Sequence, residues 1–100
     1  MTLRIFTHPA CGGCGPAVEM AWALSEAHGN LNLETVKLEN KTGLSIAQKV
    51  GIKTIPTMIF YKNEIEIKRI VGLPKVDQLE KDFLELENSH KGSKTQRNES

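Results

Sequence analysis

The chain has 100 residues, of which 39% are hydrophobic and 25% are charged. A chain of this length can bury one modest hydrophobic core, so two independently folded domains are excluded. The 13 Lys and Arg residues nearly balance the 12 Asp and Glu residues, and the formal net charge is +1. This balance argues against a nucleic-acid-binding protein, which usually carries a positive surplus. No apolar run approaches the roughly 18 residues that a membrane-spanning helix needs.

The first part of the chain predicts a strand followed by a helix. Residues 3–6 are rich in strand-forming side chains, and residues 7–9 (Thr-His-Pro) are typical of a strand that enters a loop. Apolar residues then recur at helical spacing over residues 16–27. Because proline is tolerated only in the first helical positions, the proline that opens this stretch predicts that regular helix begins near Gly13 or Cys14.

The rest of the chain predicts three more strands and two more helices. Residues 31–38 alternate between apolar and polar side chains, as a half-buried strand does, and residues 44–50 predict a short helix. Residues 57–61 and 65–71 flank a three-residue turn and predict a β-hairpin. Apolar residues at helical spacing over residues 76–86 predict a closing amphipathic helix.

The predicted order of elements is therefore βαβαββα, an α/β fold. A βαβ unit joins parallel strands by a right-handed crossover and the hairpin adds antiparallel strands, so we expect a four-stranded mixed sheet flanked by three helices. We place the folded domain at residues 1–87. Residues 88–100 contain no apolar side chain and are expected to form a disordered polar tail. On the first helix, we expect Trp22 to be a partly buried packing residue.

The most informative motif is Cys11-Gly12-Gly13-Cys14, which lies between the first strand and the first helix. A Cys-x-x-Cys pair can close a disulfide with little movement of the chain. The N-terminus of a helix supplies unpaired N–H groups and a positive dipole end, which both favour the reactive thiolate. We expect the N–H groups of Gly13 and Cys14 to be free to face the Cys11 sulfur. Beside a βαβ pattern, this motif indicates redox chemistry.

Two other interpretations of the cysteine pair stay open at this point. His8, Cys11 and Cys14 could supply three ligands of a zinc site, or two chains could share four cysteines around zinc or an iron–sulfur cluster. Alternatively, the pair could form an inert structural disulfide. A bridge that closes four residues would add only about 2 kcal/mol of stability, which makes a purely structural role a poor explanation.

A second motif, Thr54-Ile55-Pro56-Thr57, leads into the third predicted strand. Proline lacks the N–H group that a sheet ladder requires, so Pro56 belongs at a strand start or at a special bend. Alone, such a residue is usually an ordinary loop proline. Here it accompanies the cysteine pair in one short chain.

With these motifs, the chain resembles the thioredoxin superfamily from Leu3 to about Leu86, and within it a small glutaredoxin-like thioredoxin. Besides the cysteine pair, the resemblance rests on Val36-Lys37-Leu38, residues 47–52, Thr54-Ile55-Pro56-Thr57, residues 60–63 and Val71-Gly72. It implies a thioredoxin-like fold. In that fold the cis proline would fall on Pro56, and the glycine beside the redox pair would fall on Gly72.

Three features depart from the family pattern. The first strand starts at the N-terminus, as in glutaredoxins, whereas thioredoxins begin with an additional strand and helix. Ala10 stands where family members usually have tryptophan before the first cysteine. Ile5 occupies the position of the buried aspartate that assists proton transfer, which leaves Lys37, the usual partner of that aspartate, without it.

The resemblance implies a thiol–disulfide oxidoreductase that reduces protein disulfides by dithiol–disulfide exchange. We expect Cys11 to be the more exposed cysteine and the nucleophile, and Cys14 to resolve the mixed disulfide. The target is expected to dock on a shallow apolar rim that comprises Ala10, Ile55, Pro56, Thr57 and Gly72, with Pro9 beside it. A non-catalytic adaptor of the same fold is a further alternative.

The interpretation as a thiol–disulfide oxidoreductase also predicts the partners and the location of the protein. We expect disulfide-containing target proteins and an electron-donating reductase as partners, no nucleic acid, no membrane and a monomeric chain. No metal or other cofactor is expected in the reaction. Because Arg4 and His8 follow closely on Met1, and a proline comes next, we expect no signal peptide and a cytoplasmic location.

Overall fold

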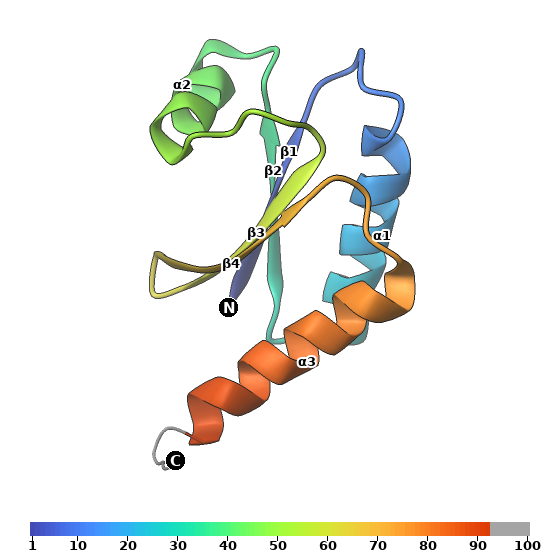
Figure 1. The fold of residues 1–100 in the computed structure, drawn as a ribbon, viewed down its shortest axis with the longest axis vertical. Helices are drawn as coiled ribbons and strands as arrows, with labels where there is room; N and C mark the ends of the chain where they lie inside the picture. Colours follow the sequence, from blue (N-terminus) through green and yellow to red (C-terminus); the bar gives the residue numbers. More distant parts are fainter. Residues whose placement is uncertain (93–100) are drawn as a thin grey trace.

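Four strands and three helices follow one another in the order βαβαββα, which confirms the order predicted from the sequence (Figure 1). The computed structural model describes residues 1–92. The strands are β1 (Thr2–Thr7), β2 (Asn32–Lys37), β3 (Thr57–Lys62) and β4 (Ile65–Val71), and the helices are α1 (Cys14–Ala27), α2 (Lys41–Val50) and α3 (Val76–Gly92).

The strands form one mixed sheet in the order β2-β1-β3-β4, which confirms the expected four-stranded architecture. β1 and β2 run parallel because α1 carries the chain back to the end of the sheet where it began. β3 pairs antiparallel with both β1 and β4. The turn between β3 and β4 is Asn63-Glu64, whose φ angles of 53° and 64° suit the two-residue turns that match the twist of a hairpin.

Helices cover both faces of the sheet, so β1 and β3 are buried on both sides. Figure 1 shows α1 and α3 on one face and α2 on the other. The core beneath α1 and α3 consists of Leu3, Ile5, Ala17, Ala21, Leu24, Leu31, Met58, Phe60, Leu79 and Phe83. The core beneath α2 consists of Phe6, Val36, Ala47 and Ile59. Successive strand residues point to opposite faces, which is why Ile5 and Phe6 belong to different cores.

Two element boundaries differ from the predicted ones near the end of the sheet that carries the cysteines. β1 continues through Thr7, which the sequence assigns to the following loop, because the Leu38 N–H donates to the Thr7 carbonyl at 2.8 Å. α2 begins at Lys41 rather than Leu44, because Asn40 has the extended backbone (φ −94°, ψ 145°) of a residue that precedes a helix.

The C-terminal helix is longer than predicted. α3 continues to Gly92, so residues 88–92 of the expected tail are helical, while residues 93–100 lie outside the described residues. The domain boundary at residue 87 therefore stays a prediction. None of the helices within residues 1–92 combines the length and the apolar character that crossing a membrane requires.

The expectation for Trp22 is wrong, because this side chain is 58% exposed. The buried residues of α1 are Cys14, Ala17, Ala21 and Leu24. Trp22 follows Ala21 and is therefore rotated by about 100° around the helix axis, away from this buried stripe. The expectation rested on the general tendency of tryptophan to bury its ring, which does not depend on the position of the residue around the helix.

α2 packs closely against the end of β2 through Gly43, a buried residue of the helix. A Cβ atom at this position would overlap with the backbone carbonyl of Lys37. Backbone atoms cannot turn aside as a flexible side chain can, so only glycine fits here without a shift of the helix. This contact holds α2 against the part of β2 that carries Lys37.

Candidate active site

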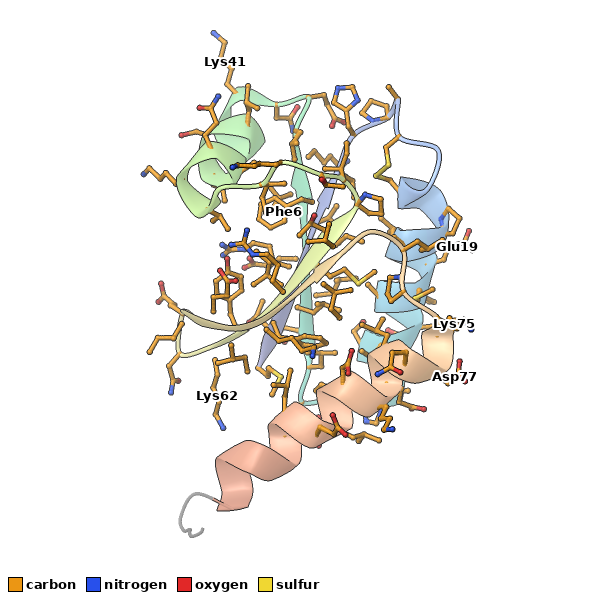
Figure 2. All side chains as sticks on the ribbon, viewed as in Figure 1. Phe6, Glu19, Lys41, Lys62, Lys75 and Asp77 are labelled. Atoms are coloured by element: carbon orange, nitrogen blue, oxygen red, sulfur yellow. A yellow bond between two sulfur atoms is a disulfide. The ribbon has the colours of Figure 1, made fainter. Side chains whose placement is uncertain are left out.

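Cys11 and Cys14 form a disulfide at the N-terminus of α1, with their Cα atoms 5.4 Å apart. Figure 2 shows the sulfur–sulfur bond beside the first turn of this helix. Gly13 precedes the helix and Cys14 is its first residue, which confirms the predicted start. Pro16 is then the third helical residue, where its missing N–H costs no bond within the helix.

The two cysteines differ in burial and in backbone contacts. Cys14 is only 4% exposed, whereas Cys11 is partly exposed. The Cys14 N–H donates to the Cys11 carbonyl at 3.4 Å, so the expectation that this N–H is free to face the Cys11 sulfur is wrong. Within the described part of the chain the Gly13 N–H donates no hydrogen bond, so it is the donor of the two that stays available.

Pro56 lies beside the redox motif, and the Ile55–Pro56 peptide bond is cis, as the resemblance implies. A Cβ atom built on Gly13 would be 3.6 Å from the Pro56 Cδ, an ordinary van der Waals contact. Gly72, with a φ of 87°, donates its N–H to the Pro56 carbonyl at 2.8 Å. The three segments that the sequence singled out therefore meet at one place.

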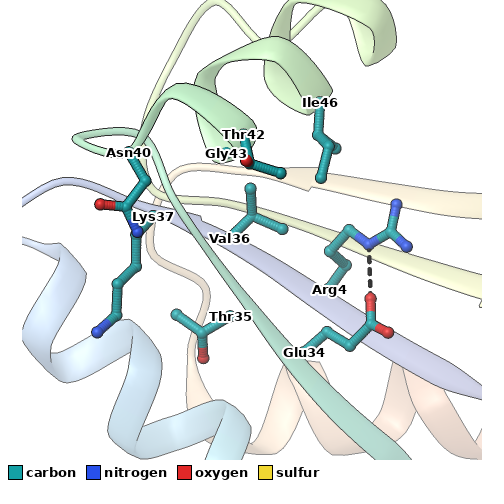
Figure 3. Close-up of a pocket in the computed structure, with 9 residues that line it drawn as sticks. All are labelled: Arg4, Glu34, Thr35, Val36, Lys37, Asn40, Thr42, Gly43 and Ile46. Atoms are coloured by element: carbon teal, nitrogen blue, oxygen red, sulfur yellow. Dashed lines mark hydrogen bonds and ion pairs between the residues drawn. The ribbon is translucent and has the colours of Figure 1, made fainter.

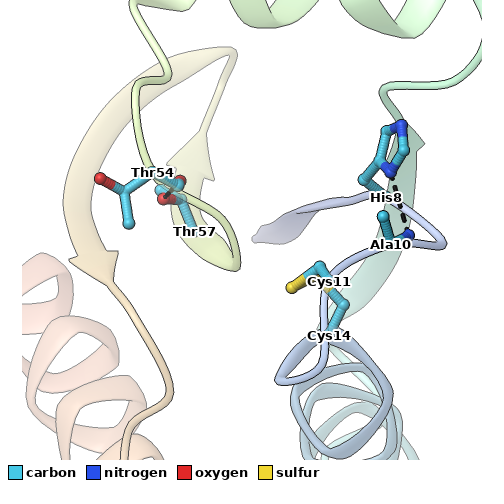
Figure 4. Close-up of a disulfide and its surroundings, with 6 residues drawn as sticks. All are labelled: His8, Ala10, Cys11, Cys14, Thr54 and Thr57. Atoms are coloured by element: carbon cyan, nitrogen blue, oxygen red, sulfur yellow. Dashed lines mark hydrogen bonds between the residues drawn. A yellow bond between two sulfur atoms is a disulfide. The ribbon is translucent and has the colours of Figure 1, made fainter.

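Thr57 supports the proline loop from inside the protein. It is 2% exposed, and its hydroxyl donates a hydrogen bond to the Thr54 carbonyl, which closes the turn around Pro56. Figure 4 shows both threonines on the opposite side of the site from Cys11 and Cys14. The Thr57 side chain therefore supports the loop from beneath and is not part of the exposed surface.

Apolar side chains are exposed on both sides of Gly72, the residue whose N–H bonds to the Pro56 carbonyl. Val71 and Leu73, which flank Gly72, are 61% and 49% exposed. The sequence names Val71 only as part of the Val71-Gly72 motif and does not single out Leu73. The exposure of both residues was not predicted, because a strand pattern does not show that β4 is an edge strand whose end is left uncovered. From here on we use the name apolar rim for Val71 and Leu73 together with four residues of the rim expected from the sequence, namely Ala10, Ile55, Pro56 and Gly72. Thr57 of the expected rim is left out because its side chain is buried, and Pro56, although also buried, is kept because it lies beside Gly13.

On another side of the disulfide lies an open pocket of about 620 Å³, which neither Pro56 nor Gly13 lines. Both cysteines line this pocket. It is also lined by Thr7 and by four titratable side chains from β1–α1, α1, β2 and the following turn, namely His8, Glu19, Lys37 and Glu39. We use the name polar pocket for this space. The disulfide therefore separates an apolar surface from a charged one.

The polar pocket has no buried carboxylate at the position where the family has one. Ile5 is fully buried in the core beneath α1 and α3. Lys37 is exposed, and Figure 3 shows its side chain directed toward α1. His8 accepts a hydrogen bond from the Ala10 N–H at its Nδ1 atom (3.0 Å), so in the neutral ring the proton resides on Nε2.

A second open pocket, of about 540 Å³, lies between β2 and α2 and is drawn in Figure 3. Arg4 and Glu34 form an ion pair there at 2.9 Å, and the Arg4 guanidinium also lies 4.7 Å from the centre of the Tyr61 ring. Neither cysteine lines this pocket, and these two charges neutralise each other. It therefore adds nothing to the redox site.

The metal interpretation finds no support in the arrangement of side chains. Residues 1–92 contain no group of three or more His, Cys, Asp or Glu side chains placed to hold a metal ion. Both cysteines are joined to each other, and His8 bonds to the backbone of its own loop.

A partly exposed cysteine, joined to a buried one at a helix N-terminus, is the arrangement by which thiol–disulfide oxidoreductases exchange disulfides. Comparison with known proteins agrees with this class. The family model Thioredoxin matches residues 2–85, and the chain belongs to the thioredoxin family. A curated thioredoxin from Chlamydia muridarum is 33% identical over 69 residues, which are 68% of each chain.

Solved structures confirm the thioredoxin-like fold. Thioredoxin O2 from Arabidopsis thaliana, in its oxidised state, matches with a TM-score of 0.75 at 22% identity, over 85% of this chain and 73% of that one. Thioredoxin NaTrxh from Nicotiana alata matches with a TM-score of 0.74 at 26% identity, over 84% and 70%. Family and disulfide together make this protein a thiol–disulfide oxidoreductase whose substrates are proteins that contain disulfides.

Proposed function

We propose that Cys11 is the attacking cysteine of this oxidoreductase and that Cys14 resolves the mixed disulfide. The observation that carries this assignment is the unequal burial of the pair, in which Cys14 is 4% exposed and Cys11 is partly exposed. A thiolate can attack a protein disulfide only where the target reaches it. The positive end of α1 and the available Gly13 N–H also favour a thiolate at Cys11.

The proposed reaction consists of two exchanges. The Cys11 thiolate attacks one sulfur of the target disulfide, and the other target sulfur leaves as a thiolate and takes up a proton. Cys14 then loses its proton and attacks the Cys11 sulfur, which releases the second target sulfur. The target disulfide gains two electrons and two protons. The Cys11–Cys14 disulfide seen in the structure is the oxidised product.

We place the target on the apolar rim. Ala10 adjoins Cys11, Pro56 lies beside Gly13, and Gly72 is bonded to Pro56. The loop before Pro56 can offer backbone groups to an extended target segment, in the manner of strand addition. Since the net charge of the chain is only +1, long-range electrostatic steering would contribute little to the choice of target. Shape and apolar contact are then the main sources of selectivity.

We further propose an electron-donating reductase as the second partner, a monomeric chain and a cytoplasmic location, with no nucleic acid or membrane as partner. The near balance of Lys and Arg with Asp and Glu supports the exclusion of nucleic acid.

Insulin reduction tests the function and the donor together. One assay supplies NADPH and a thioredoxin reductase, and the other supplies NADPH, glutathione and glutathione reductase. We expect insulin precipitation with the first system. If insulin is reduced with the glutathione system and not with thioredoxin reductase, the electron donor is glutathione and not the proposed reductase. No reduction in either system, or with dithiothreitol as donor, would overturn the proposal and favour a non-catalytic adaptor.

A matched pair of leucine variants tests the docking surface. Leu73 on the apolar rim and Leu44 on α2 are 49% and 44% exposed, so both can be changed at a similar cost in packing. Leu73→Ser should lower kcat/KM for insulin by about threefold to tenfold, because burying such a side chain is worth roughly 1 kcal/mol or more. Leu44→Ser should have no effect. Both variants should reduce a small soluble disulfide at the wild-type rate. If Leu73→Ser and Leu44→Ser lost kcat/KM for insulin equally, the placement of the target on the apolar rim would be contradicted.

A further inference from the structure

Thr7, the last residue of β1, carries a hydroxyl group that the fold buries without a partner. Thr7 is 8% exposed. No side-chain hydrogen bond within the described residues involves its hydroxyl, although its carbonyl accepts from the Leu38 N–H. Buried hydroxyl groups are normally paired, because an unpaired one loses the hydrogen bonds that it makes in water. The position of Thr7 therefore calls for an explanation.

The Thr7 side chain lies on the same face of the sheet as the redox helix. Ile5, two residues earlier, belongs to the core beneath α1, and alternate residues of a strand point the same way. Thr7 pairs with Lys37 of β2, and both residues line the polar pocket together with Cys11 and Cys14. The unpaired hydroxyl is therefore in the space beside the disulfide.

We propose that the Thr7 hydroxyl donates a hydrogen bond to the Cys14 sulfur in the reduced protein, and thereby favours the Cys14 thiolate that resolves the mixed disulfide. This inference rests on the proposed function, in which Cys11 attacks first. It assigns Thr7 as a positioning and stabilising residue for the second exchange only.

Cys14 needs such a donor more than Cys11 does. At 4% exposure the Cys14 sulfur is largely cut off from solvent, and burial disfavours a charged thiolate. Its own N–H donates to the Cys11 carbonyl at 3.4 Å. Cys11 is partly exposed, so solvent can stabilise its thiolate. A hydrogen bond to an ionised acceptor is about twice as strong as a neutral one, so one hydroxyl can matter here.

In the proposed second exchange, water in the polar pocket accepts the proton that Cys14 loses. The titratable or charged groups that face this pocket are His8 from the β1–α1 loop, Glu19 from α1, Lys37 from β2 and Glu39 from the turn after β2. In the second exchange the Cys14 proton passes to water in the pocket, and the released target thiolate takes up a proton from water. The Lys37 ammonium also favours negative charge in this space.

A chromogenic disulfide separates the two exchanges. Reduced protein is mixed rapidly with 5,5′-dithiobis(2-nitrobenzoate), and the release of the first and second thionitrobenzoate is followed from pH 5 to pH 9. The first release reports attack by Cys11, and the second reports resolution by Cys14. Thr7→Val keeps the shape of the side chain and removes the hydroxyl. It should slow the second release about tenfold near pH 6 and move its midpoint to higher pH, with the first release unchanged within twofold.

Conservative variants exclude a merely structural role. Thr7→Ser should restore the second release to within twofold of wild type, and Thr35→Val, on β2 outside the polar pocket, should leave both releases unchanged. If Thr7→Val does not fold by circular dichroism, Thr7→Ala replaces it in the same comparison. The inference would be overturned if the variant without the hydroxyl released the second thionitrobenzoate at the wild-type rate. It would also be overturned if Thr7→Ser were as slow in the second release as that variant. Loss of the first release in wild type would instead overturn the proposed function.

Discussion

The two sides of the Cys11–Cys14 disulfide differ in almost every physical respect. On the apolar rim, Pro56 packs near Gly13 and receives the Gly72 N–H at 2.8 Å, so the backbone is tightly tied and the exposed groups are apolar. On the polar pocket side, an open space of about 620 Å³ is lined by titratable side chains and by one unpaired hydroxyl.

This difference separates two tasks of a disulfide reductase. A target must be held next to Cys11, which apolar contact and fixed backbone groups can do without reference to a particular sequence. Protons must enter and leave as thiols become thiolates, which needs water and polar groups. In the proposed mechanism, the ends of β3 and β4 perform the first task and the ends of β1 and β2 perform the second.

Substitution of the cysteines is expected to have the largest effect, because the disulfide lies between the apolar rim and the polar pocket and takes part in both tasks. Cys11→Ser should abolish insulin reduction, since no accessible thiolate is left. Cys14→Ser should trap a stable mixed disulfide between Cys11 and the target, visible on a non-reducing gel. Iodoacetamide at about pH 6.5 should label Cys11 first in the reduced wild type, and preferential labelling of Cys14 would reverse the assignment.

The next effect concerns the support of the polar pocket side. Gly43→Ala should lower the free energy of unfolding by about 2 kcal/mol, because the new methyl group would overlap with the Lys37 carbonyl and force α2 away from β2. Urea denaturation measures this change. Gly29→Ala is the control, because nothing lies within 4 Å of a Cβ there, and it should change stability by less than about 0.5 kcal/mol. If the two variants had the same free energy of unfolding, the close approach of Gly43 to the Lys37 carbonyl would not restrict position 43 to glycine.

Part of the apolar rim side of the site could be predicted from the sequence. The chemistry of the cysteine pair is evident from its short motif alone, whereas Pro56 and Gly72 were predicted only through the resemblance to the thioredoxin superfamily. The exposure of Val71 and Leu73 could not be predicted, because it depends on β4 being an edge strand. That property follows from the order of strands and not from the residues themselves.

The polar pocket could not be predicted in the same way. The sequence assigns Thr7 to a loop, because Thr-His-Pro is a common strand ending and the residue that pairs with Thr7, Lys37, is far along the chain. Gly43 in sequence is only a weak helix former, and the Lys37 carbonyl that requires it is visible only in three dimensions. Properties that depend on register and on close approach need the structure.

A smaller effect is expected from the two glycines of the redox motif. Gly12-Gly13 gives the reduced loop many conformations, so closing the disulfide costs entropy, and we expect the pair to be less reducing than the roughly −270 mV of thioredoxin. Alanine fits both positions, because no atom lies within 4 Å of a Cβ at Gly12 and the nearest at Gly13 is 3.6 Å away. Replacing both should make the pair more reducing by about 20–40 mV, measured against a glutathione buffer. A shift in the opposite direction would contradict the entropic argument.

The smallest effect concerns an ion pair that supports the apolar rim. Arg69 on β4 donates to the Val50 carbonyl at the end of α2 and to the Glu66 carboxylate, each at 2.9 Å, and so fixes the start of the segment that leads to Pro56. The hydrogen bond from Arg69 lowers the pKa of Glu66 below 4.5, and the same bond raises the pKa of Arg69, which stays charged throughout.

Because the pKa of Glu66 is lowered in the folded state, its contribution to stability is complete above about pH 4.5 and is lost as the pH falls through the lower folded value. The pair is about one-third exposed, so solvent screening limits it to about 0.5 kcal/mol. Glu66→Gln should therefore unfold at lower urea concentration than wild type at pH 7, and the difference should disappear near pH 2. In 1 M salt at pH 7 the difference should also shrink. A difference that persists unchanged at low pH would mean that Glu66 acts through packing, and that the apolar rim is held without this charge.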